Sequence, residues 1–503
     1  MSLLGIDLGT TGIKCAAYSE DGTMLGKTYR EYTLYMPKKG VVELDANKVW
    51  ETLCENISEL NTFTEVASDP VDALSISVSG DEALPVDASG RPLYNTIMAM
   101  DKRGEKENRW INSILGEENI YRITGQPPAN LYPLNRLIWF KQNRPDIFEK
   151  TSKFLCWEEF IFQKLGAEPV TDYSVVCRTL AFDILKRDYS EEILKPVGID
   201  KSIFPKAALS GTLIGKADKK LSERLGFKKE VSIVTGGFDQ ICAALGSGVI
   251  KDGMASIGTG TFEVMQICFA NPLSDPKLMK FGYPFCNHAL ADLFITMSIN
   301  SSGGVIFKWY RDNFGYYEKQ AAKESGLNAY DVIMDLALKA KYPVLFMPYF
   351  EGSQTPKNNP DATGALIGLT LRTTKEDIIK GMFEGITFDL KLNLEKFEET
   401  GVKIDAIRAT GGGARSDTWL QIKADITGKT IQKIDVDESG CMAVAVLAGY
   451  GTGKFDSVKD VLGKWVKIGK QFEPDAKKFK KYESKYRQWL QVATDLDKHK
   501  IMH

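Results

Sequence analysis

The sequence predicts a large α/β protein built from two related halves. With 503 residues, the chain is longer than one hydrophobic core usually organises. Segments with strand character alternate with amphipathic helical segments along much of its length. A strand followed by a turn of glycines and threonines occurs twice, at residues 9–12 and 258–261, about 250 residues apart. We therefore expect two α/β domains, at residues 1–248 and 249–503, with a ligand held in the cleft between them.

The composition favours small-molecule chemistry. The 64 Lys and Arg residues nearly balance the 66 Asp and Glu residues, so no global field would recruit nucleic acid or an anionic membrane. No stretch reaches the ~18 apolar residues of a membrane span, and the N-terminus lacks the basic flank of a signal peptide. The eight cysteines form no C-x-x-C pair, which argues against zinc and against a disulfide framework. We expect a cytoplasmic protein whose cysteines are reduced core residues.

Histidine is scarce, which bears on any proton transfer. The chain has only His288, His499 and His503, and the last two belong to a terminal tail expected to be mobile. A His-based triad or a His-rich metal site is therefore not expected. A base acting near neutral pH would be a carboxylate, so the search narrows to Asp and Glu beside glycine-rich turns.

The first hairpin has the residues of a phosphate site. Residues 3–8 have strand character, and the turn Gly9-Thr10-Thr11-Gly12 follows. Its glycines let backbone N–H groups approach anionic oxygens, its threonines donate hydroxyls, and Asp7 is placed to hold a nucleotide-bound magnesium ion. Lys14 is either a further cation near the phosphates or an exposed strand lysine. An ordinary first hairpin is the alternative interpretation of this stretch.

Strands then give way to helices. Residues 13–45 alternate as antiparallel strands, Asp45 has the place of an N-cap, and residues 46–60 have helical spacing. A strand at 71–78 ends in Ser79-Gly80-Asp81-Glu82, polar groups at the strand end where open α/β sheets usually bind ligands. A short strand near 97–100 precedes Asp101-Lys102-Arg103, and residues 105–165 are expected to be mostly helical.

Asp239 stands at a second strand-to-helix junction. A strand at 231–234 leads into Gly236-Gly237-Phe238-Asp239-Gln240, and a helix of small residues follows. The glycines allow a ligand close to the backbone, and a helix N-terminus stabilises nearby negative charge. An aspartate that merely caps the helix is the alternative.

The second half repeats the strand and glycine–threonine turn of the first hairpin. Residues 255–261 again give a strand and then alternating glycines and threonines. Further on, Gly411-Gly412-Gly413 follows a strand at 404–409 and precedes a helix with Trp419, which makes room for a flat ring or a phosphate. The paired hairpins indicate a duplicated domain with a nucleotide between its halves. The C-terminal helix, with Tyr486 and Trp489 on its apolar face, is expected to pack on the second domain.

In this order the motifs resemble those of the FGGY carbohydrate kinase family. Residues 5–14 are similar to its first phosphate motif, 258–261 to its second, 411–414 to its adenosine motif, and 236–246 to the stretch with its catalytic aspartate. The resemblance implies two ribonuclease-H-like domains of the actin and hexokinase type. It also implies a kinase that uses ATP and Mg²⁺ to phosphorylate a small sugar or polyol, and it leaves a homodimer open.

The resemblance also assigns the site residues. Asp239 would be the catalytic base and would share the metal with Asp7. The phosphates of ATP would contact Thr10, Thr11, Lys14, Gly258 and Thr259. The adenosine would lie on Gly411, Gly412, Gly413 and Ser416. The acceptor would contact Asp81, Glu82, Asp101, Arg103, Asp239, Gln240 and Phe262.

The acceptor itself is predicted by charge. Xylulokinases usually carry Gln-Met-His-Gly, and glycerol kinases an Arg-Glu pair, where this chain has Gly80-Asp81-Glu82-Ala83. Carboxylates accept well from the hydroxyls of an uncharged sugar, whereas a sugar acid would need a cation such as Arg103. Residues 350–356 resemble a segment of xylulokinase-like members. A neutral ketopentose such as xylulose is therefore expected.

Three alternatives stay open at this point. The chain could be a gluconate kinase or a glycerol or erythritol kinase of the same family. It could be a non-catalytic, nucleotide-switched protein of the actin type, which also uses paired hairpins. It could bind sugar without turning it over, although the presence of both Asp7 and Asp239 argues against this.

Overall fold

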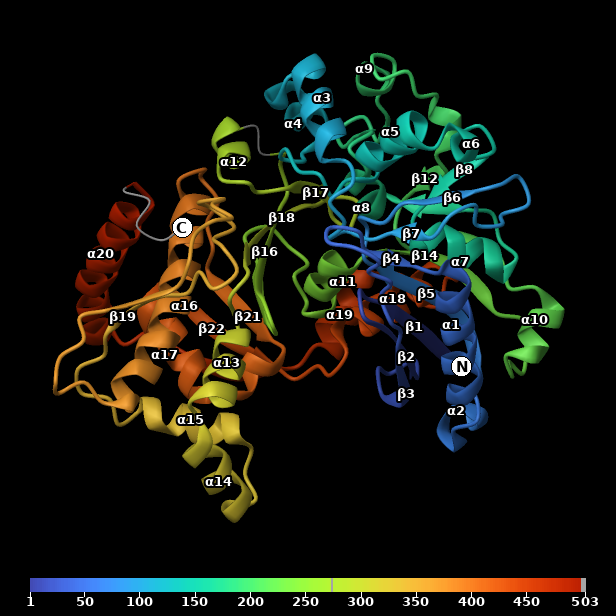
Figure 1. The fold of residues 1–503 in the computed structure, drawn as a ribbon. Coiled ribbons are helices and arrows are strands. Elements are labelled where there is room, and N and C mark those ends of the chain that lie inside the picture. The colour runs from blue at the N-terminus through green and yellow to red at the C-terminus, as the bar shows by residue number, and fades with distance from the viewer. Residues whose placement is uncertain (273–274, 499–503) are drawn as a thin grey trace.

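Each half of the molecule is built around its own twisted sheet. The structure is a computed structural model, and it describes residues 1–272 and 275–498. His499 and His503 lie outside the described residues. Figure 1 shows the first half in blue and green and most of the second half in yellow to red, with the sheets facing each other across the middle.

The first sheet has the order β13-β14-β5-β1-β2-β3. Its strands are β1 (Ser2–Leu8), β2 (Gly12–Tyr18), β3 (Met24–Glu31), β5 (Val71–Val78), β13 (Leu213–Lys216) and β14 (Ser232–Phe238). β1 pairs antiparallel with β2 and parallel with β5, which in turn pairs parallel with β14. The side chains of β1 are buried on both faces, as expected for a central strand covered by helices.

The second sheet has the order β17-β18-β16-β15-β21-β22-β23. Its strands are β15 (Ala255–Thr259), β16 (Glu263–Phe269), β17 (Phe285–Asn287), β18 (Phe294–Asn300), β21 (Ala406–Thr410), β22 (Thr430–Ile434) and β23 (Ile468–Phe472). The hairpin β15–β16 corresponds to β1–β2, and the parallel strands β21 and β22 correspond to β5 and β14. This confirms the predicted duplication of an α/β domain.

Helices and short strands complete both halves. The first half contains α1 (Ala46–Leu60), α2 (Thr64–Ser68), α3 (Glu105–Leu115), α4 (Glu117–Thr124), α5 (Pro133–Asn143), α6 (Pro145–Phe148), α7 (Trp157–Leu165), α8 (Tyr173–Val176), α9 (Glu191–Leu194), α10 (Lys219–Arg224) and α11 (Asp239–Gly246). Its short strands are β4 (Glu43–Leu44), β6 (Leu84–Val86), β7 (Thr96–Ile97), β8 (Lys153–Leu155), β9 (Val170–Asp172), β10 (Phe182–Asp183), β11 (Asp188–Tyr189) and β12 (Lys206–Ala208). The second half contains α12 (Pro276–Lys280), α13 (Val305–Asn313), α14 (Tyr316–Ser325), α15 (Ala329–Ala337), β19 (Leu345–Met347), β20 (Ala365–Ile367), α16 (Lys375–Glu398), α17 (Asp417–Thr427), α18 (Ser439–Gly451), α19 (Val458–Trp465) and α20 (Ala476–Lys498).

One helix crosses from the second half to the first. α18 packs against β1, β5 and β14 and against α11, and Figure 1 shows it in red-orange among the blue strands. Glycine makes the close approach possible, because a Cβ on Gly5 would lie 1.8 Å from the carbonyl oxygen of Cys441. The N-terminus of α18 is thereby brought beside the end of β1. The predicted domain boundary at 248/249 stays a prediction.

Several predicted elements match the structure closely. The predicted strand at 71–78 has the bounds of β5, and α1 spans the predicted 46–60 with Asp45 accepting from the backbone N–H of Asn47 at 2.9 Å. The C-terminal helix α20 buries Tyr486 and Trp489 and packs on α16 and α17, as expected. The eight cysteines are unpaired, and seven of them are buried.

The predicted strand at 231–234 was too short. Strand β14 runs from Ser232 to Phe238 and includes both Gly236 and Gly237. A Cβ on Gly236 would lie 1.8 Å from the carbonyl oxygen of Ile76, so the glycine is needed for close strand packing. The pairing of β14 with β5 shifts register between Val234 and Gly237, and this irregularity directs the strand end that carries Asp239.

Within the described residues, no helix has the length and apolar character required to cross a lipid bilayer.

Candidate active site

Asp7 lies at the end of β1, where the first hairpin turns. Its Oδ1 accepts a hydrogen bond of 2.8 Å from the Ser77 hydroxyl on the neighbouring strand β5. Gly440, near the start of α18, faces the same carboxylate, and a Cβ there would lie 3.3 Å from Oδ1 of Asp7. The Tyr32 hydroxyl donates to the Gly9 carbonyl and so ties down the turn. Thr10 is half-buried and Thr11 is exposed, so solvent reaches both residues of the turn.

Lys14 has a partner in the structure. Its Nζ lies 3.0 Å from Oε2 of Glu438, which precedes α18. This hydrogen bond and the negative charge of Glu438 outweigh partial burial and raise the pKa of Lys14, so the lysine stays charged. The contact ties the first hairpin to α18, and any role of Lys14 at the phosphates stays a prediction.

Asp239 is the first residue of α11 and follows directly on β14. Phe238 occupies the N-cap position, so Asp239 does not cap the helix; its Oδ1 accepts from the N–H of Gln240 at 2.6 Å. Two side chains hold the end of β14 by hydrogen bonds to its backbone. Glu158 accepts from the backbone N–H of Gly236 at 2.7 Å, and Ser174 accepts from that of Phe238 at 2.9 Å.

Electrostatics set Asp239 apart from an ordinary surface carboxylate. Burial, followed by the charges of Asp7 and Asp81, raises the pKa of Asp239 to about 7. Burial also raises the pKa of Asp7, against the lowering effect of Ser77. A carboxyl group with a pKa near neutrality is suited to accept a proton during catalysis.

The two aspartates also fit a magnesium ion shared with phosphate. The described part of the chain has no cluster of three or more His, Cys, Asp or Glu side chains arranged to hold a metal by themselves. Magnesium commonly binds through one or two carboxylates, with waters and substrate phosphates completing the shell. Asp7 and Asp239 fit that description, because the charge of Asp7 raises the pKa of Asp239 and a shared cation would relieve that repulsion.

The second hairpin presents Thr259 from β15. Its hydroxyl donates to Oε2 of Glu263 at 2.7 Å and accepts from Nζ of Lys423 at 3.1 Å. Lys423 and Glu263 form a buried ion pair behind the hairpin, and Lys423 lies over the ring of Trp419 at 4.5 Å. Gly258 lies next to Thr259 on the same strand. A positive charge thus backs the second predicted phosphate contact.

A cavity of about 570 Å³ opens beside this hairpin. Residues from several elements line it, including Thr259, Phe307, Tyr330, Gly412, Gly413 and Trp419. Apolar and aromatic walls with a few polar groups, at this volume, are typical of a pocket for a nucleotide-sized ligand.

The glycine turn shapes one wall of that cavity. Gly411 has φ of 79°, and a Cβ on Gly413 would lie 2.6 Å from Cγ2 of Thr259, so larger residues would not fit. The hydroxyl of Ser416 caps α17, because it accepts from the N–H of Trp419 at 3.1 Å. Contact between Ser416 and adenosine stays a prediction.

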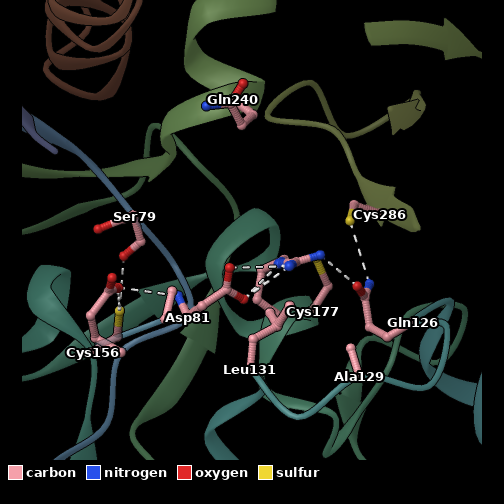
Figure 2. A network of polar contacts seen from close by, with 12 residues as sticks. Ser79, Asp81, Gln126, Ala129, Leu131, Cys156, Cys177, Gln240 and Cys286 are labelled. Carbon is pink, nitrogen blue, oxygen red and sulfur yellow. Dashed lines mark hydrogen bonds and ion pairs between the residues drawn. The ribbon is translucent and has the colours of Figure 1, made fainter. Parts of the chain in front are cut away.

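Asp81 and Glu82 follow β5, but their carboxylates have different surroundings. Glu82 is 1% exposed, and its Oε2 accepts from the N–H of Asp81 at 3.1 Å and from the Cys156 thiol at 3.7 Å. Burial, with a smaller contribution from Asp81, raises the pKa of Glu82 to about 8, so it is largely neutral at pH 7. Figure 2 shows Ser79, Cys156 and Asp81 grouped on one side of the network.

Asp101 and Arg103 pair with each other. Arg103 donates from Nε to Oδ1 of Asp101 at 2.9 Å and from Nη2 to Oδ2 at 2.7 Å, and its Nη1 lies 2.8 Å from Glu43. The guanidinium also lies 5.1 Å from the ring of Trp139. Two carboxylates therefore already neutralise Arg103.

Gln240 links the two halves of the molecule, and Phe262 lies in the second hairpin. Oε1 of Gln240 accepts from Nε2 of Gln266 on β16 at 3.2 Å, which links α11 to the second sheet. Phe262 lies in the turn of the second hairpin and is 49% exposed. Its predicted contact with the acceptor stays a prediction.

Several site residues escaped the sequence analysis. Ser77 and Gly440 contact Asp7, Lys423 supports Thr259, and Phe307 and Tyr330 line the cavity. Ser77 precedes the recognised polar run by two positions, so its place at a strand end was a usable indication. Gly440 and Lys423 are remote in sequence from the groups they meet, and no local pattern marks them.

The duplicated α/β fold is of the actin and hexokinase type, with a cavity beside the second hairpin and Asp239 at the start of α11. The model of the FGGY carbohydrate kinase N-terminal domain matches residues 2–246, and that of the C-terminal domain matches residues 253–452. The chain belongs to the FGGY family of carbohydrate kinases. It is therefore an enzyme, a phosphotransferase acting on a sugar with ATP as donor, and not a non-catalytic nucleotide switch.

Individual relatives agree on the family and differ in substrate. The chain is 29% identical to a xylulose kinase of Staphylococcus epidermidis, over 98% of each chain. It is also 29% identical to a gluconokinase of Bacillus licheniformis, over 92% of this chain and 90% of the relative. A ligand-bound xylulose kinase from Lactobacillus acidophilus superimposes with a TM-score of 0.89 at 23% identity, covering 99% of this chain and 98% of that one, which shows the shared fold.

Proposed function

We propose that this sugar kinase transfers the γ-phosphoryl group of ATP to a hydroxyl of a small neutral sugar or polyol, and that a ketopentose such as xylulose is its acceptor. The observation that carries the proposal is Asp239, a half-buried carboxyl group with a pKa of about 7 at the junction of β14 and α11, close enough to Asp7 to feel its charge. A homodimer and a cytoplasmic location remain expectations from the sequence.

The residues divide the work of phosphoryl transfer. Asp239 accepts the proton of the attacking hydroxyl as the oxygen approaches the phosphorus. Asp7 and Asp239 would hold Mg²⁺, which would neutralise phosphate charge. Thr10 and Thr11 donate hydrogen bonds to phosphate oxygens from the first hairpin, and Gly258 and Thr259 contact the phosphates from the second. The adenine and ribose occupy the cavity beside Gly412 and Gly413, between Tyr330 and Trp419.

Charge supports an uncharged acceptor. Asp7 and Asp81 lie close enough to Asp239 for their charges to raise its pKa. A sugar carboxylate placed among them would meet like charges in a partly desolvated site, which is costly unless a free cation faces it. Arg103 does not supply that cation, because Asp101 and Glu43 already bind it.

Gluconate is the second candidate. The gluconokinase relative is as similar in sequence as the xylulose kinase relative, so similarity alone does not separate the two acceptors. Glycerol and erythritol are the remaining candidates within the same family.

The test is a parallel measurement of kcat/KM by coupled ADP release for xylulose, ribulose, glycerol, erythritol and gluconate. We expect a neutral acceptor to lead, with a ketopentose ahead of the polyols. Gluconate clearly ahead of all four neutral acceptors would contradict the charge argument. Absence of acceptor-dependent ADP release with every sugar, polyol and sugar acid tried would contradict the assignment of activity.

A further inference from the structure

Arg178 forms a further buried ion pair, and its partner is Asp81, one of the residues predicted to contact the acceptor. The residue belongs to a short 3-10 helix, Cys177–Thr179, that follows α8. Its Nε donates to Oδ1 of Asp81 at 3.0 Å and its Nη2 to Oδ2 at 3.1 Å. The side chains are 8% and 13% exposed, so the pair is fixed and largely shielded from water.

The pair is close to the reacting carboxylate. The guanidinium of Arg178 lies 5.1 Å from the ring of Phe238, the residue immediately before Asp239, and 5.2 Å from the ring of Tyr132 on its other side. The charge of Asp81 is one of the causes of the raised pKa of Asp239. Stacking between two rings holds the guanidinium plane in one orientation.

The same guanidinium connects the two halves. Nη1 of Arg178 donates to Oε1 of Gln126 at 2.7 Å, and Nε2 of Gln126 lies 3.4 Å from the sulfur of Cys286 on β17 of the second sheet. Figure 2 shows Asp81 left of centre and Gln126 on the right, with Cys286 above Gln126 and Gln240 at the top of the view. Three N–H groups of Arg178 are thus used, and two of its five are left for a ligand.

The other cations near the acceptor side are already engaged. Arg136 is fully buried and donates to four backbone carbonyl oxygens, those of Met98, Ala99, Asp81 and Leu131. Arg103 is held by Asp101 and Glu43. Arg178 differs because, among the described residues, Asp81 is the one carboxylate that forms an ion pair with its guanidinium.

We propose that Asp81 selects uncharged acceptors by neutralising Arg178, so that Arg178 is the specificity residue of the acceptor site and Asp81 holds it in place. This inference rests on the proposed sugar kinase function and adds the residue that sets its acceptor class. A guanidinium freed from Asp81 would present a fork of donors matched to a carboxylate, so the site would then favour a sugar acid.

The experiment compares acceptor ratios in a charge series. Wild type, Asp81→Asn, Arg178→Gln and the double variant are each assayed with xylulose and gluconate, by kcat/KM and by equilibrium binding in calorimetry. Asp81→Asn should raise the gluconate-to-xylulose ratio by at least about tenfold, because it uncovers a desolvated cation. The double variant should lose that gain, and Arg178→Gln alone should lower the ratio by leaving Asp81 uncompensated.

A matched pair provides the control. Asp101→Asn removes one of the two carboxylates that bind Arg103 and leaves Glu43, so the ratio should stay near the wild-type value. If it rises while Asp81→Asn does not raise it, the specificity cation is Arg103 and the proposal is overturned. An unchanged ratio in Asp81→Asn also overturns the proposal. If Asp81→Asn does not fold, an unchanged ratio in Arg178→Gln overturns it instead. If wild type turns over neither acceptor, the proposed function is at fault, and the binding ratios still decide the role of Asp81.

Discussion

At the scale of single residues, Asp239 is subject to opposed influences. A carboxylate at a helix N-terminus is normally favoured in its charged form, yet burial and the neighbouring charges of Asp7 and Asp81 raise its pKa to about 7. The result is a base that is partly protonated at neutral pH and fully available above it. Its chemistry therefore depends on neighbours that come from two other strands.

This predicts the pH dependence of the free enzyme. Because the base must be ionised, kcat/KM for the acceptor should fall about tenfold per pH unit below a midpoint near 7 and level off above it. The raised pKa means that protonation, and not deprotonation, removes activity as pH falls. A pH profile of the rate from 5.5 to 9, with acceptor and Mg·ATP both below saturation, checks this, and a rate that does not change over that range would show that Asp239 has an ordinary pKa or is not the base.

Single residues also show which parts of the site could be predicted. Asp7, Asp239 and the three glycines of residues 411–413 could be found because a strand pattern beside a glycine-rich stretch marks each of them in the local sequence. Arg178 could not, because it meets Asp81 across 97 positions and nothing in residues 173–183 indicates that partner. Asp101 and Arg103 were expected at the acceptor, and the structure pairs them with each other and with Glu43.

At the scale of elements, α18 is the helix on which the nucleotide side depends. It belongs to the second half by sequence, yet it packs on the first sheet and brings Gly440 against Asp7. The secondary structure of this segment follows from its run of small and apolar residues. Its docking against β1 does not, because long-range packing is absent from local patterns, and only the glycine at position 5 hints at a close approach.

Gly440→Ala tests the contact between α18 and Asp7. The added Cβ would lie 3.3 Å from Oδ1 of Asp7, so the carboxylate must shift, and binding of magnesium and ATP should weaken roughly several-fold. Gly463→Ala in α19 is the matched control, because a Cβ there has no atom within 4 Å and alanine should stabilise the helix by roughly 0.5–1 kcal/mol. Calorimetric titration with Mg·ATP measures the effect on binding, and thermal melts measure the effect on stability. Equal ATP affinity in Gly440→Ala and wild type would contradict the role given to α18.

At the scale of the whole molecule, the duplicated sheets place one phosphate hairpin in each half. Thr10 and Thr11 come from the first sheet, Thr259 from the second, and the base Asp239 stands at the start of α11 near both. The overall architecture could be predicted because the hairpin signature occurs twice at corresponding positions. The cross-packing of α18 and the Gln240–Gln266 link could not, since both join segments remote in sequence.

This arrangement predicts closure on substrate. ATP held by both hairpins and an acceptor bound in the first half should draw the halves together, because closure excludes water from the transferred phosphoryl group. Small-angle scattering should show a smaller radius of gyration with xylulose plus a non-hydrolysable ATP analogue than with either alone. An identical radius in all states would contradict closure.

The most direct test of the account is Asp239→Asn, assayed at pH 8 with the best acceptor and titrated with Mg·ATP. The substitution keeps the shape of the side chain and removes the base, so kcat should fall by ~10² to 10⁴-fold, far more than ATP affinity, to which Asp7 and the two hairpins also contribute. That separation would identify Asp239 as the residue that accepts the acceptor's proton. Full kcat in the variant would contradict the account and leave Asp239 as no more than the first residue of α11.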